Sequence, residues 1–196
     1  MVSITMIALT DFGDLAVLLP LAVVMLLWLL AMRSLSEAAW WLAAVALCTG
    51  GTALLKIYFF ACPIDREVIS PSGHTSFSTL VYGALAVVIA AELKVGWQRI
   101  AIIGGGTAFV VAIAVSRFVL RAHSPPEVVF GMVVGLASLA LFGEHYLRRR
   151  PAEVPLKPLL VAVVVLMAAF HGRELHAEPL LHAISWYFHI ASIACA

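Results

Sequence analysis

Six long runs of apolar residues make up most of this chain of 196 residues. A helix needs about 20 mainly apolar residues to cross a bilayer. Runs of roughly this length that carry few charges lie at 14–32, 36–60, 75–93, 99–120, 127–145 and 156–171. They are continuous, whereas the strands of a membrane β-barrel alternate between apolar and polar residues. The sequence therefore predicts an all-α fold, a polytopic membrane bundle of about six transmembrane helices.

The composition supports a membrane protein and argues against several other classes. Hydrophobic residues make up 63% of the chain and charged residues only 12%, against about 25% charged residues in soluble domains. A net charge of +1 and the absence of basic runs interleaved with aromatics argue against a nucleic acid partner. Because the connections between the runs are short and no repeat is visible, residues 1–196 are predicted to form a single integral membrane domain.

The C-terminal stretch 179–196 is apolar but contains His182 and His189. It is predicted to lie in the membrane interface or to re-enter the membrane, and a short seventh span is the alternative. Four histidines, His171, His176, His182 and His189, are spaced by five, six and seven residues. Because that spacing does not make a compact ligand set, no metal site is predicted there.

Lys and Arg are unevenly distributed between the two sets of loops. Seven of them fall on one side, namely Arg33, Lys94, Arg99, Arg148, Arg149, Arg150 and Lys157. Lys and Arg favour the cytoplasmic side of a membrane. The loops 61–74 and 121–126 are therefore expected to face away from the cytoplasm, toward the periplasm of a bacterial inner membrane.

Ionisable residues converge on that outward-facing side. Lys56 and Arg117 lie near the outer ends of the second and fourth runs, His74 opens the third, and His123 and Glu127 flank the start of the fifth. Such residues are costly at membrane depth and by default suggest a function. Charged side chains also reach the interface from the ends of ordinary spans, so the convergence alone leaves that alternative open.

The residue types at this end favour phosphoryl transfer. Lys and Arg supply positive charge and hydrogen-bond donors for a phosphate, and Ser72 and Gly73 precede a helix whose N-terminus attracts anions. Of two histidines, one can attack phosphorus while the other donates a proton. A carboxylate four residues after His123 can orient its ring. The sequence has no Asp/Glu cluster to hold a metal, so neither a metal nor another cofactor is expected.

Two segments make the interpretation specific. Residues 116–127, "SRFVLRAHSPPE", fit the pattern S-R-x5-H-x3-[D/E], and "PSGH" lies upstream at 71–74. Together they resemble the type 2 phosphatidic acid phosphatase superfamily, which includes membrane lipid phosphatases and soluble haloperoxidase relatives. The resemblance covers roughly residues 50–140 and implies a helical bundle.

The resemblance also implies a role for each matching residue. His123 corresponds to the nucleophile that forms a phosphohistidine, and His74 to the residue that protonates the leaving oxygen. The phosphate-binding positions correspond to Arg117, Ser72 and Gly73. Lys56 corresponds to the lysine of the first family motif, K-x6-R-P.

The chain departs from the family pattern at two places. The first motif requires arginine and proline at positions 63 and 64, where this chain has Pro63 and Ile64. Arg66 is close by and is the candidate replacement for that arginine; alternatively, it pairs with a neighbouring carboxylate or faces solvent. Glu127 stands where the family usually has Asp, and its longer side chain keeps the carboxylate that would orient His123.

The sequence thus predicts a metal-independent integral membrane phosphatase. Its expected substrate is a membrane lipid phosphate or diphosphate, a phospholipid or an isoprenyl phosphate, cleaved through a phosphohistidine. A lipid phosphotransferase, which passes the phosphoryl group to a lipid or sugar hydroxyl, remains an alternative. So does a catalytically weakened lipid-binding or transport protein, because the first motif is incomplete.

Overall fold

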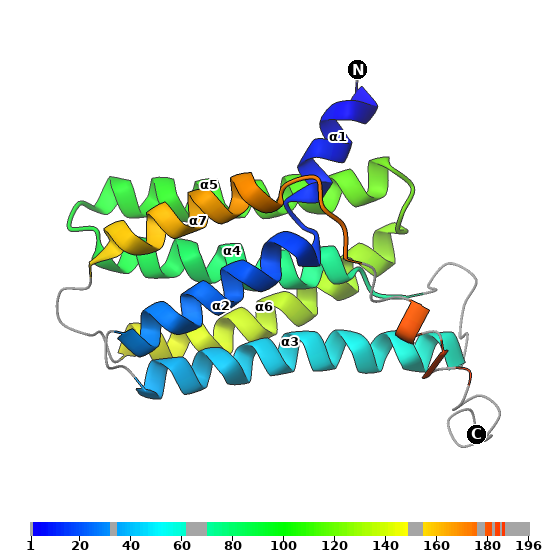
Figure 1. The fold of residues 1–196 in the computed structure, drawn as a ribbon, viewed down its shortest axis with the longest axis horizontal. Coiled ribbons are helices and arrows are strands. Elements are labelled where there is room, and N and C mark those ends of the chain that lie inside the picture. The colour runs from blue at the N-terminus through cyan, green and yellow to red at the C-terminus, as the bar shows by residue number, and fades with distance from the viewer. Residues whose placement is uncertain are drawn as a thin grey trace.

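Seven helices account for most of the chain that the computed structural model describes. The described residues are 2–31, 35–61, 70–148, 155–175, 179–181, 183, 184 and 186. In chain order the helices are α1 (Val2–Asp11), α2 (Leu15–Ala31), α3 (Leu35–Ala61), α4 (Gly73–Glu92), α5 (Gly96–Val119), α6 (Pro125–Arg148) and α7 (Leu156–Phe170). None of the described ranges contains a strand. The predicted all-α bundle is confirmed, and Figure 1 shows its long helices running side by side.

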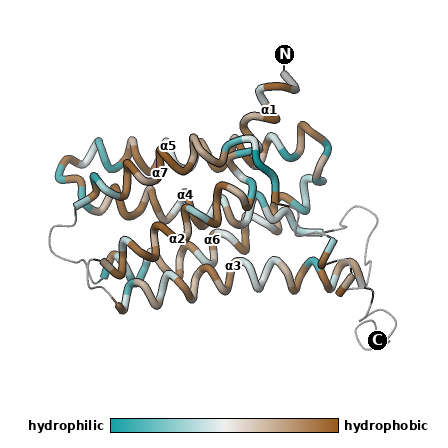
Figure 2. Tube along the Cα trace, viewed as in Figure 1, coloured by the Kyte–Doolittle hydropathy of each residue, from teal (hydrophilic) through white to brown (hydrophobic). Residues whose placement is uncertain are grey.

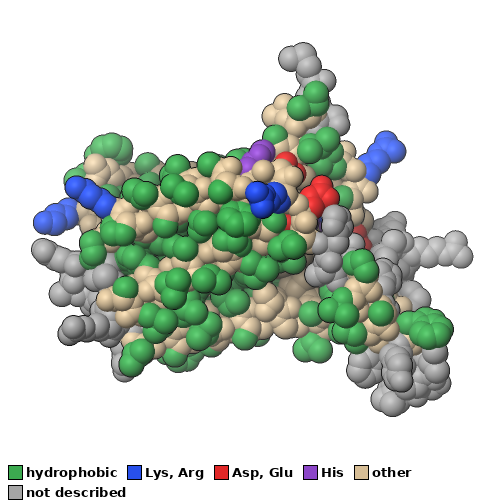
Figure 3. Space-filling view, viewed as in Figure 1, with side chains coloured by type: hydrophobic (Ala, Val, Ile, Leu, Met, Phe, Trp, Pro, Cys, Tyr) green, Lys and Arg blue, Asp and Glu red, His purple; other side chains and the backbone are tan. Residues whose placement is uncertain are grey.

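Five helical segments in the described part of the chain are long and apolar enough to cross a membrane. They are Ile4–Ala31, Leu35–Phe60, Gly73–Glu92, Gly96–Val119 and Pro125–Arg148. The sixth predicted run is the apolar helix α7, whose 15 residues extend only about 22 Å against a hydrocarbon core of about 30 Å. Hydrophobic residues run along the helices and polar residues gather toward their ends (Figures 2 and 3). The fold is that of an integral membrane protein.

The first segment begins earlier than the sequence predicts. The predicted span starts at residue 14, but the structure adds α1 before it. The chain turns between α1 and α2, where the N–H of Gly13 donates to the carbonyl of Thr10 and that of Asp14 to the carbonyl of Asp11. Thr10 and Asp14, on either side of this turn, are buried in the bundle.

Helix α4 lies at the centre of the bundle and packs against α2, α3, α5 and α6. Its many buried hydroxyl groups bond within the helix, as Thr79 does to the carbonyl of Thr75 at 2.6 Å, so they need no water. Close packing against α6 depends on Gly131 and Gly135. A Cβ on Gly131 would overlap the carbonyl oxygen of Ser72, and one on Gly135 would lie 2.5 Å from the carbonyl oxygen of Ser76. These two glycines are packing residues.

The up-and-down order of the helices brings the predicted site residues to one end of the bundle. The N-terminal ends of α2, α4 and α6 and the C-terminal ends of α3, α5 and α7 meet there (Figure 1). The opposite end carries the described cations Lys94, Arg99, Arg148 and Lys157, which lie at helix ends or between helices. Arg33, Arg149 and Arg150 lie outside the described residues, as does most of 179–196.

Candidate active site

The turn after α5 brings His123 back to Arg117. Arg117 lies in the last turn of the helix, and Arg121 takes a left-handed conformation with φ of 55°. This conformation reverses the chain as helix ends commonly do. The N–H groups of Ala122 and His123 then donate to the carbonyl of Arg117, at 3.0 and 3.3 Å. The five residues that the motif places between Arg117 and His123 are therefore those that end α5 and reverse the direction of the chain.

Glu127 fixes the ring of His123. It lies in the first turn of α6, and its Oε2 is 3.1 Å from Nδ1 of His123 and accepts the N–H of Ser124 at 2.8 Å. Both side chains of the pair are buried, with 7% and 6% of their surface exposed. A hydrogen bond at Nδ1 leaves Nε2 as the ring nitrogen that can meet a ligand.

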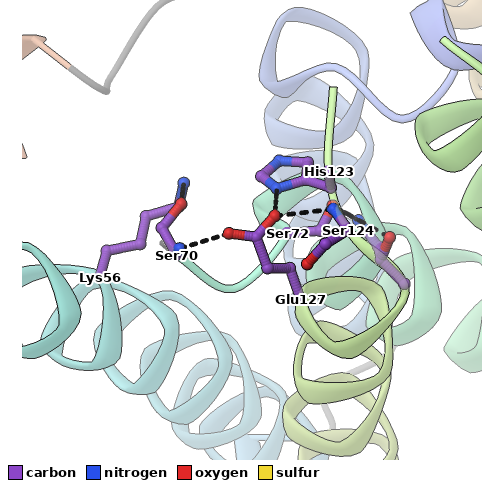
Figure 4. Close-up of polar contacts among 7 residues, drawn as sticks. Lys56, Ser70, Ser72, His123, Ser124 and Glu127 are labelled. Atoms are coloured by element: carbon purple, nitrogen blue, oxygen red, sulfur yellow. Dashed lines mark hydrogen bonds and ion pairs between the residues drawn. The ribbon is translucent and has the colours of Figure 1, made fainter. Parts of the chain in front are cut away.

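Glu127 also joins this turn to the segment before α4. Its second carboxylate oxygen, Oε1, accepts the N–H of Ser70 at 2.5 Å, and its backbone carbonyl accepts the N–H of Ser72 at 3.0 Å. Figure 4 shows the carboxylate between His123 and Ser124 on one side and Ser70 on the other. The glutamate at this position thus orients the histidine and anchors the "PSGH" segment at the same time.

Ser72 caps α4 rather than lining a cavity. The hydroxyl oxygen of Ser72 accepts a hydrogen bond from the N–H of Thr75 at 3.4 Å and another from the Thr75 hydroxyl at 3.0 Å. Ser72 is fully buried. With Thr75 capped, Gly73 and His74 are the residues of the first turn whose N–H groups have no acceptor within the described structure. Such groups and the helix dipole make an anion site.

A cavity of about 440 Å³ opens at this end of the bundle. Among the residues that line it are five of the predicted site residues, Lys56, Gly73, His74, Arg117 and His123. Ser72 and Glu127 stand behind this wall, since neither contributes to the lining. Arg66 lies outside the described residues, so its proposed role stays a prediction.

The two predicted phosphate-binding cations reach the cavity from different helices. Lys56 of α3 is 4% exposed, and its Nζ donates to the Ser70 hydroxyl at 3.3 Å. Arg117 of α5 donates from Nη1 to the Thr10 hydroxyl at 3.1 Å. The cavity therefore combines two cations, two imidazoles and a helix N-terminus, the donors that an anionic oxygen group requires.

These charges also set the protonation of His123. Burial lowers the pKa of His123 below its ordinary value, and the positive charges of Arg117 and Lys56 lower it further. The hydrogen bond and charge of Glu127 act in the opposite direction but do not offset them. The ring is thus held neutral near neutral pH, which is the state in which an imidazole nitrogen can attack.

The beginning of the chain and the segment after α7 also contribute to the cavity, which the sequence did not predict. Asp14, at the start of α2, places its Oδ2 3.5 Å from Nε2 of His74. Thr10, Asp11 and Glu174 also line the cavity. The signal in the sequence that could have indicated this contribution is Asp14, an acidic residue at the start of the apolar run 14–32 and on the same side of the membrane as the other site residues.

The described residues include no group of three or more His, Cys, Asp or Glu placed to hold a metal ion. His171, the described member of the C-terminal histidines, bonds through Nε2 to the carbonyl of Ala8 at 2.9 Å. Its ring contacts that of Phe12 in a tilted arrangement, with centroids 4.4 Å apart and an interplanar angle of 53°. His171 therefore fastens the end of α7 to the turn between α1 and α2.

Fold and site together define a helical membrane protein with a cavity at one end that is lined by two histidines and two cations. The family model of the PAP2 superfamily matches residues 54–151, half of the chain. This chain belongs to the PAP2 superfamily, which confirms the resemblance carried by its two motifs.

One curated relative is an uncharacterized 22.5 kDa protein in the cps region of Klebsiella pneumoniae. It is 31% identical over 137 residues, which cover 67% of this chain and 64% of that protein, so the match spans less than two thirds of the relative. No solved structure matches the chain significantly. The family model does not extend to residues 1–53 or 152–196.

Proposed function

We propose that this protein is a membrane phosphatase that hydrolyses a lipid phosphate or diphosphate through a phosphohistidine at His123. The observation that carries the proposal is the buried His123 ring, held by Glu127 at Nδ1 in the wall of a cavity that also contains Lys56 and Arg117. A buried imidazole with a fixed tautomer next to two cations is suited to attack a phosphoryl group.

The reaction has two halves. In the first, Nε2 of His123 bonds to phosphorus while the bond from phosphorus to the leaving oxygen breaks, and His74 gives that oxygen a proton. In the second, a water oxygen attacks phosphorus, His74 takes the water's proton, and the electron pair of the broken N–P bond returns to His123. Lys56, Arg117 and the N–H groups of Gly73 and His74 stabilise the charge on the phosphoryl oxygens.

The proposed substrate is a lipid because the cavity sits at the end of an apolar bundle. The lipid headgroup would bind in the cavity while the lipid tail stays among the exposed hydrophobic side chains of the helices. The proposed location is a bacterial inner membrane with the cavity facing the periplasm. The seven loop cations that the sequence places on the opposite side support this orientation.

The test is phosphate release by purified protein in detergent, from a panel of phospholipid and isoprenyl phosphates. His123→Ala should reduce kcat by several orders of magnitude, because it removes the nucleophile. His145→Ala is the matched control, since His145 bonds to Ser36 at the other end of the bundle, and it should keep nearly full activity. Chelators should leave the wild type active. Transfer to an added acceptor lipid instead of water would favour a phosphotransferase, and substantial activity in His123→Ala would contradict the mechanism.

A further inference from the structure

The carboxylate of Asp14 makes two kinds of contact at the cavity. Its Oδ1 accepts the N–H of Ala16 at 2.8 Å, which caps α2, and the N–H of Leu175 at 2.9 Å. Its Oδ2 lies 3.5 Å from Nε2 of His74. The side chain of Asp14 is 8% exposed and that of His74 is 25% exposed. One oxygen is thus fixed by the backbone, while the other faces the histidine.

The arrangement parallels the pair at the other histidine. Glu127 is held by the N–H groups of Ser70 and Ser124 and orients His123. Asp14 is likewise held by two backbone N–H groups and faces a histidine of the same cavity. The ring atoms differ, because Glu127 contacts Nδ1 and Asp14 contacts Nε2.

We propose that Asp14 is a positioning residue that holds the His74 ring in place, with Nε2 toward the carboxylate, so that Nδ1 can act as the general acid. The inference rests on the proposed function. It goes beyond the family match, which covers residues 54–151 and so does not include Asp14.

Cations and carboxylates both line the cavity that contains His74. The other ionisable residues of this lining come from α1, α3, α5, the turn after α5 and the segment after α7, and they are Asp11, Cys48, Lys56, Arg117, His123 and Glu174. Within the described part of the chain, Asp14 is the residue whose carboxylate is in ion-pair contact with His74.

The path of the proton follows from this geometry. Asp14 stays ionised throughout and gives up no proton. With Nε2 of His74 facing Asp14, Nδ1 is the nitrogen that passes its proton to the leaving oxygen as that oxygen takes the electron pair of the P–O bond. His74 is left neutral and recovers a proton at Nδ1 from the water that attacks phosphorus in the second half.

Asp14→Asn removes the negative charge but keeps the cap of α2, because asparagine caps a helix about as well as aspartate does. The matched control is Asp11→Asn, which removes one carboxylate from the same cavity wall three residues earlier. Each variant is assayed with two phosphate esters, an alkyl phosphate and p-nitrophenyl phosphate. An alkoxide needs a proton to leave, whereas p-nitrophenolate leaves without one.

We expect Asp14→Asn to lower kcat for the alkyl ester by about 10²–10⁴-fold, the range that general acid catalysis contributes. The aryl ester should lose less than tenfold. Asp11→Asn should not show this selective loss. Equal losses with both esters, or no loss with the alkyl ester, would overturn the proposal.

A second measurement separates this proposal from the proposed function. Nitrogen NMR of histidine-labelled protein reports the contact at Nε2 of His74, without any turnover. The Nε2 signal should change in Asp14→Asn, and an unchanged signal would refute the pairing. If the wild type released no phosphate from any ester while this change was still seen, the proposed function would fail and the role of Asp14 as a general-acid partner would fail with it. The ion pair would then remain only as a structural contact.

Discussion

Glu127→Gln tests the most connected side chain of the site, with almost no change of shape. Among the described residues, the carboxylate accepts hydrogen bonds from His123 and Ser124 at Oε2 and from Ser70 at Oε1. A glutamine has one acceptor oxygen and an NH₂ group that only donates. Whichever way the amide turns, the NH₂ group must therefore face a donor.

The two orientations of the amide have different consequences. If the amide oxygen takes the place of Oε2, His123 keeps its tautomer but the N–H of Ser70 faces an NH₂ group. An unsatisfied buried donor costs about 1–3 kcal/mol of stability. If the amide is reversed, Nδ1 of His123 must accept a hydrogen bond, which moves its proton to Nε2 and blocks attack on phosphorus. In both cases the negative charge that stabilises a cationic imidazole is lost.

The expected result is a fall in kcat of about 10²–10⁴-fold, which corresponds to about 2.7–5.4 kcal/mol of lost transition-state stabilisation. Phosphate release at saturating substrate measures it, and elution on size exclusion with thermal unfolding in detergent checks that the variant folds. A Glu127→Gln protein that kept more than about a third of wild-type kcat, a loss of under ~0.7 kcal/mol, would refute the assignment of Glu127 as the residue that orients His123.

Glu127→Asp is the companion variant. It keeps the charge but shortens the side chain by one C–C bond, about 1.5 Å. The carboxylate can then no longer reach both His123 and the N–H of Ser70. We expect about a tenfold loss of kcat, smaller than that of glutamine, because one of the hydrogen bonds is given up while the charge remains. A loss larger than that of Glu127→Gln would mean that the anchoring of Ser70 matters more than the charge.

Two further predictions concern pH and orientation. Because the pKa of His123 is lowered and the ring must be neutral to attack, kcat/KM should stay high below pH ~6.5, the ordinary histidine value, and fall only as pH drops through the lowered pKa. Lys56→Met should move this fall in kcat/KM to higher pH, because it removes one of the cations that lower the pKa of His123. If kcat/KM of the wild type already fell at or above pH ~6.5, the lowered pKa of His123 would be contradicted. For orientation, Arg121→Cys in a protein without its native cysteines should react with an impermeant maleimide in intact cells, whereas Lys157→Cys should react only after permeabilisation. The reverse pattern would show that the cavity faces the cytoplasm.

The architecture and the family could be predicted from the sequence because the signals for both are local. Apolar runs of membrane length define helices wherever they occur, and helices that alternate in direction bring every second chain end to the same side. The sequence alone therefore assigns Lys56, His74 and Arg117 to one site. The pattern S-R-x5-H is also recognisable in a single sequence, because it spans only a helix end and the turn that follows it.

The roles within the site were harder to predict, because they depend on which atoms face the cavity. Ser72 belongs to the "PSGH" motif, yet its hydroxyl turns inward to cap α4, while the adjacent Gly73 lines the cavity. A motif names residue types but not the direction of their side chains. Similarly, the extra methylene of Glu127 looked like a tolerated departure, whereas the structure shows its carboxylate bridging two segments.

The contribution of Asp14 could not be predicted from any spacing, because Asp14 and His74 lie far apart in the chain and share no motif. The turn between α1 and α2 places Asp14 next to His74 in the first turn of α4. The segment after α7 contacts Asp14 through the N–H of Leu175. Loop cations and apolar runs indicate which side of the membrane a residue occupies, but not its neighbour on that side. The two histidines and Glu127 thus lie within the segment that the family model matches, whereas Asp14, the proposed partner of His74, lies before that segment.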